Sequence, residues 1–365
     1  MFGKSSFDLW KKTNQKLQET RRYVKEEHIN EKLNNFKLKL HSTRELDYLQ
    51  DRKESLYTLG KECDWYINEK SILKLVDTKE PKTIFINSRT PKTLINFTIN
   101  ILPNLNHKFV IVVAGYDWTW PLGLLDPDQY RYHRVPEWQD LKMKLINNPN
   151  IVRIFVENLD MDHPKLEPIP LGMCFARFDK YYHQILNGEI DINYDDKDIE
   201  CLSQHNIHWK CNADFRNWYF KYADDRIKFN ELLKKEPLNK LIKSVQHDIE
   251  QTMYGRGVDE FKTNVLKSTF LICIHGGGLD PCPKVWEGIL LGAIPIIKKS
   301  TVSPAFKDLP VVVVDEFDEK HLTQDNFDKW WDDLSPYYHN KDKRKEVLYK
   351  LSTEYWINHI KSFVP

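Results

Sequence analysis

Residues 268–297, STFLICIHGGGLDPCPKVWEGILLGAIPII, decide the fold class of this chain. The apolar run 268–274 has the composition of a buried strand, and three glycines follow it directly. We predict a helix from Lys284 to about Leu291, because Gly292 ends it and another apolar strand, 293–297, comes next. A strand, a glycine loop, a helix and a strand in this order predict a parallel α/β unit.

The glycine loop is a candidate anion site. Glycines at a strand end let the backbone approach a ligand closely. The helix after the loop presents unpaired N–H groups and the positive end of its dipole. Lys284 would add a fixed positive charge, and Glu287, on the same helix face, suits the diol of a ribose. We therefore expect a nucleotide site formed by His275, Gly276, Gly277, Gly278, Asp280, Lys284 and Glu287, with a plain strand–turn–helix as the alternative.

Three better-known loops do not fit this stretch. The P-loop pattern G-x-x-x-x-G-K-[ST] is absent. Asp280 and Pro281 interrupt any G-x-G-x-x-G fingerprint, which weakens a nicotinamide-dependent oxidoreductase as an alternative function. The letters HGGG also occur in esterase oxyanion loops, but the G-x-S-x-G elbow that such enzymes need is missing.

Further α/β patterns extend outward from this stretch. Short apolar runs at 83–87, 107–114 and 151–156 alternate with helical segments, which predicts a second parallel sheet. Alternation of apolar and polar residues at Ile207, Trp209 and Cys211 predicts a strand. Residues 217–236 are predicted to form a helix. We expect five parts: a helical extension (1–80), a first lobe (81–175), a polar linker or insertion (176–204), a second lobe (205–335) and an amphipathic C-terminal helix (336–365). The extension would either pack on the body or mediate self-association.

Composition excludes several classes of protein. The 365 residues carry 54 Lys and Arg against 53 Asp and Glu, so the net charge is +1 and a nucleic-acid partner is not expected. The six cysteines are scattered, which favours free thiols in a reducing compartment. We see no stretch long enough to span a membrane and no signal peptide, so a cytoplasmic protein is expected.

The chain resembles a known family. The run from Ser268 through Gly292 and Pro295 is similar to the donor lobe of exostosin-like glycosyltransferases. VVAGYDWTWP (112–121) and IVRIFVENLDMDHPKLEPIPLGM (151–173) resemble first-lobe segments of that family. The resemblance covers roughly residues 83–315, and its C-terminal motif is the more specific part.

The resemblance implies a GT-B fold with two Rossmann-like lobes. A nucleotide sugar, with UDP favoured, would bind the second lobe, and a glycan or other hydroxyl acceptor the first. The implied reaction is direct displacement with inversion, without a metal or another cofactor. Lys284 stands where the family often has Arg, and the membrane anchor of animal members is missing. Lysine keeps the charge of arginine but loses its bidentate fork. The missing anchor favours a microbial or viral member, in the host cytoplasm if viral.

Asp117 is the candidate general base. It follows the predicted strand 108–114, at the strand end where α/β proteins place their sites. The flanking aromatic residues Tyr116, Trp118 and Trp120 would stack on an acceptor sugar. The alternative is an aspartate that caps a turn, with tryptophans in the core. Arg216 and Arg226 would reach the diphosphate or lie solvated on a helix.

Metal binding is the weaker interpretation. Asp126–Asp128 and Asp160–Asp162 match the D-x-D motif of metal-dependent glycosyltransferases, which leaves such an enzyme as an alternative. Cys201, His205, His208 and Cys211 have zinc-ligand chemistry, but His208 and Cys211 would point to opposite faces of a strand. A non-catalytic sugar- or nucleotide-binding protein of the same fold is the other alternative.

Overall fold

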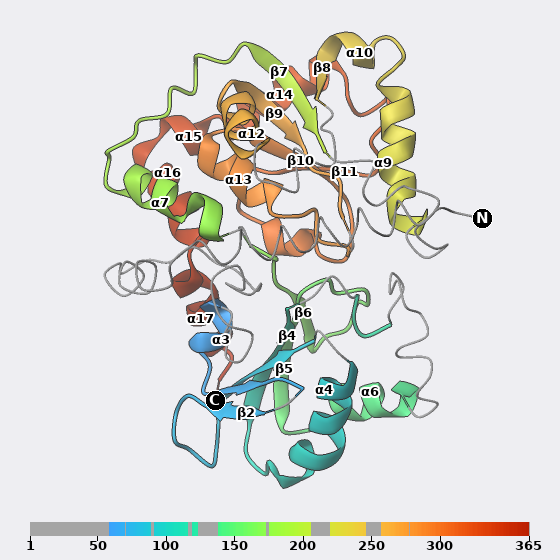
Figure 1. Cartoon of the computed structure of the whole chain (residues 1–365), viewed down its shortest axis with the longest axis vertical. Coiled ribbons are helices and arrows are strands. Elements are labelled where there is room, and N and C mark those ends of the chain that lie inside the picture. Colours follow the sequence, from blue (N-terminus) through green and yellow to red (C-terminus); the bar gives the residue numbers. More distant parts are fainter. Residues whose placement is uncertain are drawn as a thin grey trace, which may run out of the picture.

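The computed structural model describes residues 58–69, 71–88, 91–115, 119–122, 138–172, 175–205, 220–245, 257–276 and 278–364. Two open sheets form two lobes, one above the other in Figure 1. The two-lobe α/β class expected from the sequence is confirmed. No helix among these residues has the length and hydropathy needed to cross a membrane.

The first sheet is parallel except at one edge. Its order is β2-β1-β3-β4-β5-β6, and only β2 runs antiparallel to its neighbour. The strands are β1 (Trp65–Ile67), β2 (Ile72–Lys74), β3 (Thr83–Asn87), β4 (Phe109–Ala114), β5 (Ile151–Val156) and β6 (Leu166–Pro168). The boundary expected at residue 81 is therefore wrong, because β1 pairs with β3 inside this sheet. Residues 1–57 of the expected extension lie outside the described residues.

Strand alternation gives this sheet two buried faces. Ile84, Ile86, Ile111 and Val113 pack on one side, against α4 (Pro91–Asn96), the π-helical η1 (Phe97–Ile101) and α6 (Trp138–Ile146). Their neighbours along β3 and β4 face the other side, where α3 (Thr58–Lys61) and α17 (Thr353–Lys361) lie. The short 3-10 helix η2 (Leu102–Asn104) follows η1 and ends the helical stretch one residue after Pro103.

The second sheet is fully parallel and its strand order reverses once. The order is β11-β10-β9-β7-β8, so the chain goes from β7 to β8 on one side and then back to β9 on the other. The strands are β7 (Ile199–Gln204), β8 (Ile242–Val245), β9 (Ser268–Ile272), β10 (Ile294–Lys298) and β11 (Val312–Val314). In such doubly wound sheets, ligands bind beyond the carboxyl ends of the two strands at the reversal. Here these strands are β7 and β9.

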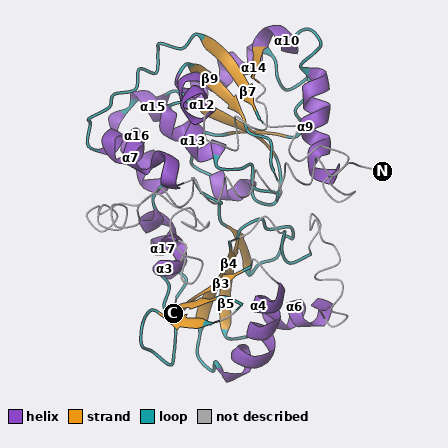
Figure 2. Ribbon diagram, viewed as in Figure 1, coloured by secondary structure: helices purple, strands orange, loops and turns teal. Residues whose placement is uncertain are grey.

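Helices cover both faces of the second sheet (Figure 2). On one face, α9 (Phe220–Leu232) and α14 (Gln324–Leu334) contribute Phe229 and Phe327 to a core with Phe270. On the other, α12 (Gly257–Leu266), α13 (Lys284–Leu291) and α16 (Lys341–Lys350) belong to a core that continues into the first lobe. Short helices α10 (Leu238–Leu241), η3 (Ser303–Phe306) and α15 (Pro336–His339) connect these elements.

Two further predictions from the sequence, the linker and the C-terminal helix, need correction. The stretch 176–204 is not simply a linker, since it contains most of α7 (Phe175–Leu186) and all of the central strand β7. The strand predicted around 207–211 falls outside the described residues. The predicted C-terminal helix is also broken: α16 ends at Lys350, and α17 begins after Ser352, whose side chain accepts a hydrogen bond from the Tyr355 N–H.

The C-terminal helix α17 packs back on the first lobe. His359 Nε2 lies 2.5 Å from Glu167 Oε1, and the His359 ring contacts Phe155 of β5. Phe363, just after the helix, also packs on Phe155. The chain end therefore fastens the two lobes together, beside α3 in Figure 1.

Candidate functional site

The reversal between β7 and β9 brings together the carboxyl end of each strand and the N-terminus of α13. His205 follows β7, and His275 and Gly276 follow β9. Lys284 is the first residue of α13 and lies next to the β7 end, because its Nζ donates to Gln204 O at 2.6 Å. The predicted glycine loop thus lies where the strand order predicts a ligand. Gly277 and Arg216 lie outside the described residues.

Two cations lie at this position. Arg226 of α9 is buried and donates through Nε to His275 O at 3.1 Å and through Nη2 to Ile274 O at 3.3 Å. Burial lowers the pKa of Lys284, and the Arg226 charge lowers it further, whereas Cys282, Cys273 and Glu287 raise it. The structure therefore brings Lys284 and Arg226 to one place, and their binding of a diphosphate stays a prediction.

His205 is a third basic side chain here, and sequence analysis had considered it only as a zinc ligand. Its residue is 6% exposed, and its Nδ1 lies 3.2 Å from Ser203 Oγ. Burial lowers its pKa to about 2, and the charges of Lys284 and Arg226 contribute. The imidazole is therefore neutral at ordinary pH. Its buried Nε2 has no hydrogen-bond partner among the residues that the structure describes.

A charged network borders the site on the side of β10. Asp225 Oδ2 lies 3.2 Å from His275 Nε2 and 3.4 Å from Lys298 Nζ. The hydrogen bond from His275 is the main reason that the pKa of Asp225 falls to about 2. Lys298 also pairs with Glu316 at 2.8 Å. Asp225 is therefore an anion that fixes the His275 ring and lies beside a further cation.

Glu287 is buried in the first turn of α13, and its charge acts on Lys284. Glu287 lies one turn after Lys284 on this helix, and the phosphate and ribose roles of the two residues stay predictions. Cys201, one of the considered zinc ligands, is buried in the core of β7, and His208 and Cys211 lie outside the described residues.

The end of the glycine loop makes contact with the first lobe. A Cβ built on Gly278 would lie 2.2 Å from Asn158 Oδ1, so the loop needs glycine there to approach Asn158. The Asp280 N–H donates to that same oxygen at 2.8 Å, and Asp280 Oδ2 accepts from the Leu171 N–H at 2.8 Å. We call these contacts among Asn158, Leu171, Gly278 and Asp280 the lobe clasp. They show that Gly278 and Asp280 serve the interface between lobes, a role that the sequence did not indicate.

The predicted acceptor side is described only in part. Asp117, Tyr116 and Trp118 lie outside the described residues. Trp120 is 2% exposed and packs in the first-lobe core, so its ring presents no face to a sugar. This is the core alternative that the sequence left open for the tryptophans.

Glu157 is a buried carboxylate at the carboxyl end of β5, next to the end of β4 where Asp117 was predicted to act. The sequence motifs did not indicate it. It directly follows β5 and is 2% exposed. Its Oε2 accepts from the Gly115 N–H at 2.8 Å, two residues before Asp117. Glu157 thereby anchors the start of the segment that carries the predicted base.

The D-x-D candidates do not form a metal cluster where they are described. Asp160 is buried and its Oδ1 accepts from the Leu122 N–H at 2.8 Å. Asp162 is exposed, and Asp126 and Asp128 lie outside the described residues. The described part of the chain contains no group of three His, Cys, Asp or Glu residues arranged to hold a metal.

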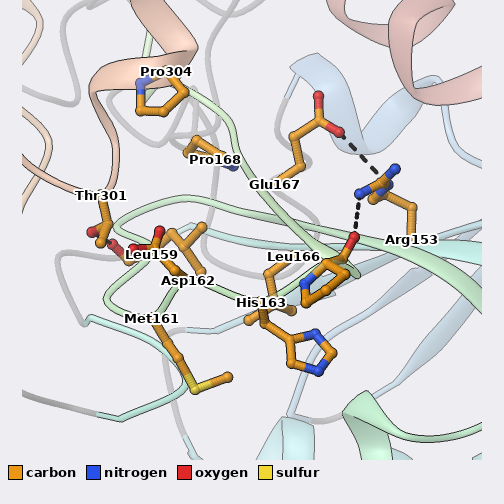
Figure 3. A pocket seen from close by; sticks show the side chains of 11 residues that line it. Arg153, Leu159, Met161, Asp162, His163, Leu166, Glu167, Pro168, Thr301 and Pro304 are labelled. Atoms are coloured by element: carbon orange, nitrogen blue, oxygen red, sulfur yellow. Dashed lines mark hydrogen bonds and ion pairs between the residues drawn. The ribbon is translucent and has the colours of Figure 1, made fainter.

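A separate pocket of about 550 Å³ lies where the segment after β5 meets η3 (Figure 3). Leu159, Met161 and Pro304 contribute apolar walls, and Asp162 and His163 contribute polar groups. Arg153 belongs to its lining but is already engaged, with Nη1 donating to Pro164 O and Nε 3.7 Å from Glu167. This pocket is distinct from the cluster at the β7–β9 reversal.

Comparison with known proteins identifies no family. No family model and no curated protein matches the chain. One similar solved structure is an alpha-glucosyltransferase in complex with UDP and a 13-mer DNA containing an HMU base. Its sequence identity to this chain is 12% and the TM-score is 0.33, with 78% of this chain and 80% of that chain covered. An alpha1,3-fucosyltransferase is similar at 14% identity and a TM-score of 0.26, with 80% of each chain covered. Likeness at this level does not establish an activity for this chain.

Proposed function

We propose that this protein is a glycosyltransferase that binds a nucleoside diphosphate sugar at the β7–β9 reversal and transfers the sugar to a hydroxyl acceptor. One observation carries the proposal: Lys284, Arg226 and the start of α13 converge at the reversal point of a parallel sheet. Cations and the positive end of a helix dipole at one position suit a diphosphate leaving group. The exostosin-like sequence resemblance supplies the sugar-transfer chemistry.

The roles proposed for the second-lobe residues rest on this placement, and the role proposed for Asp117 rests on the sequence. Lys284, Arg226, the glycine-loop amides and the α13 dipole would stabilise the departing nucleoside diphosphate, and Glu287 would hold its ribose. Asp117 would deprotonate the acceptor hydroxyl, and inversion would follow from direct displacement. With cations in place at the diphosphate, the reaction needs no metal. UDP is the favoured donor, and a glycan the favoured acceptor, by resemblance.

A non-catalytic binding protein of the same fold is the competing proposal. A panel of UDP-, GDP-, ADP- and CDP-sugars separates the two, first by thermal shift and then by release of nucleoside diphosphate. Because a selective ligand raises apparent stability, one donor class should raise the melting temperature. Binding with no turnover on any acceptor would favour the non-catalytic protein. Complete loss of activity in EDTA would favour the metal-dependent alternative.

The base assignment has its own test. Asp117→Asn keeps the size of the side chain but removes its ability to accept a proton. Turnover should fall by about 10² to 10⁴, the usual contribution of a general base. The dissociation constant for the nucleoside diphosphate should stay within about twofold. Glu157→Gln is the companion variant. A larger loss of turnover there than in Asp117→Asn, with an unchanged melting temperature, would transfer the role of base to Glu157, whereas a lowered melting temperature would indicate its anchoring role.

A further inference from the structure

His205 differs from the other basic groups of the site because one of its nitrogens has no protein partner. Buried polar atoms in native proteins are nearly always hydrogen-bonded, and those that are not call for an explanation. His205 is only 6% exposed, and its Nε2 atom is buried without a hydrogen-bond partner among the described residues. A ligand that completes this hydrogen bond is a direct explanation.

The position of His205 points to the same ligand as the reversal of the sheet. The residue directly follows β7, one of the two strands between which the order reverses. Its ring packs near Phe229 of α9, with 6.4 Å between ring centroids. The charged groups that act on it are Lys284 from α13 and Arg226 from α9. An anion held by these two cations would therefore lie next to the imidazole.

The contact between Ser203 and the other ring nitrogen, Nδ1, bears on whether Nε2 donates or accepts. Ser203 is buried, and its Oγ lies 3.2 Å from His205 Nδ1. When the serine hydroxyl donates to Nδ1, the proton of the neutral imidazole is on Nε2, which is then a donor. A neutral donor adds a hydrogen bond for an anion without adding a third positive charge beside Lys284 and Arg226.

We propose that His205 is a further ligand-binding residue whose Nε2–H donates a hydrogen bond to a phosphate oxygen of the nucleoside diphosphate. The proposal rests on the proposed nucleotide site and adds to it a specific donor that the glycine-loop motif does not contain. Ser203 is the positioning residue, because its hydroxyl, by donating to Nδ1, would keep the ring proton on Nε2.

A matched pair of variants tests the proposal. His205→Gln places an amide donor near the Nε2 position, whereas His205→Asn reaches only the Nδ1 position. UDP and inorganic pyrophosphate are the two probes, titrated by calorimetry into wild type, both variants and Lys284→Met. We expect His205→Asn to weaken both probes about tenfold and His205→Gln to stay within about threefold of wild type. Ser203→Ala should give an intermediate loss, since the tautomer is no longer fixed.

The possible results separate this proposal from the proposed function. Equal affinity in His205→Asn and wild type, with weakened binding in Lys284→Met, overturns the role of His205 and leaves the nucleotide site in place. A loss for UDP but not for pyrophosphate places the contact on the nucleoside and also overturns the proposal. If wild type binds neither probe, the proposed function itself fails. Circular dichroism and melting temperature establish that each variant is folded, and His205→Gln provides the test should His205→Asn not fold.

Discussion

At the scale of single residues, the candidate site combines cations with a histidine that stays neutral. Lys284 and Arg226 are held by carbonyl oxygens at the ends of β7 and β9, so their positions are fixed before a ligand arrives. Preorganised donors of this kind stabilise developing negative charge without the cost of reorganisation. The same two charges, together with burial, keep His205 unprotonated.

The pKa of His205 gives a prediction for stability against pH. An unfolded histidine takes up a proton near pH 6.5, whereas the folded protein does not protonate His205 until about pH 2. The unfolded state therefore binds more protons between these values, and the free energy of unfolding falls as the pH decreases below 6.5. The contribution of His205 is about 1.4 kcal/mol per pH unit.

Denaturant unfolding at several pH values between 7 and 5 measures this contribution. His205→Gln lacks the titrating group, so its free energy of unfolding should fall less steeply than that of wild type over this range. His205→Asn should behave in the same way, although it removes a different hydrogen bond. Parallel curves for wild type and both variants would contradict the burial of a neutral His205.

Only part of this site is recognisable from the sequence. Lys284, Glu287 and the glycine loop are contiguous, so their pattern could be recognised. His205, Asp225 and Lys298 are far apart in the chain and meet the loop only through the strand order of the second sheet. No local motif encodes that order. Asp117 stays a prediction, because it lies outside the described residues.

At the scale of elements, the predictions from sequence succeed where apolar runs are long and isolated. Thr83–Asn87 and Ile151–Val156 were predicted with the bounds that the structure has, and α13 spans Lys284–Leu291 as expected. The strand β7 was missed because its short apolar content, IECLSQ, follows the acidic run 195–198 and resembles a polar linker. The break between α16 and α17 depends on a cap at Ser352, which a periodicity argument ignores.

The glycine loop gives a prediction at this scale. Gly278→Ala places a Cβ 2.2 Å from Asn158 Oδ1, which is too close for any real contact. Moving the loop or the Asn158 side chain should reduce the free energy of unfolding by about 1–3 kcal/mol. Chemical denaturation of the purified variant measures the change.

A second substitution controls for the mechanism of this loss. Asn158→Gly removes the obstructing side chain, and glycine accepts the backbone φ of +57° that Asn158 adopts. In an Asn158→Gly background, Gly278→Ala should cost markedly less than in wild type. An unchanged cost in that background would show that Gly278 is required for another reason.

At the scale of the whole molecule, the donor loop and the first lobe are physically connected. The Asp280 carboxylate accepts from the Leu171 N–H of the first lobe and from the Cys282 N–H of its own loop. The backbone of Asp280 donates to Asn158, and one hydrophobic core runs through both lobes. Movement of one lobe is therefore expected to affect the loop that leads into α13.

Removing the Asp280 carboxylate tests this connection. Asp280→Ala leaves the Leu171 and Cys282 N–H groups without that acceptor, each at an expected cost of about 1–3 kcal/mol. Hydrogen exchange at the Leu171 amide should become faster, and the melting temperature should fall. Asp315→Ala is the control, because Asp315 is an exposed carboxylate of the same lobe. Similar behaviour of the two variants would mean that the lobe clasp contributes nothing to the interface.

The central claim is that a nucleoside diphosphate binds at the reversal between β7 and β9. Titration calorimetry with UDP tests this binding most directly. Wild type should bind UDP, and Lys284→Met should bind it about 10- to 100-fold more weakly, the cost of a lost charge-assisted hydrogen bond. Lys299→Met, which removes an exposed lysine of the same lobe, should bind like wild type. Equal affinity of Lys284→Met and wild type, or no binding of any nucleoside diphosphate, would contradict the account.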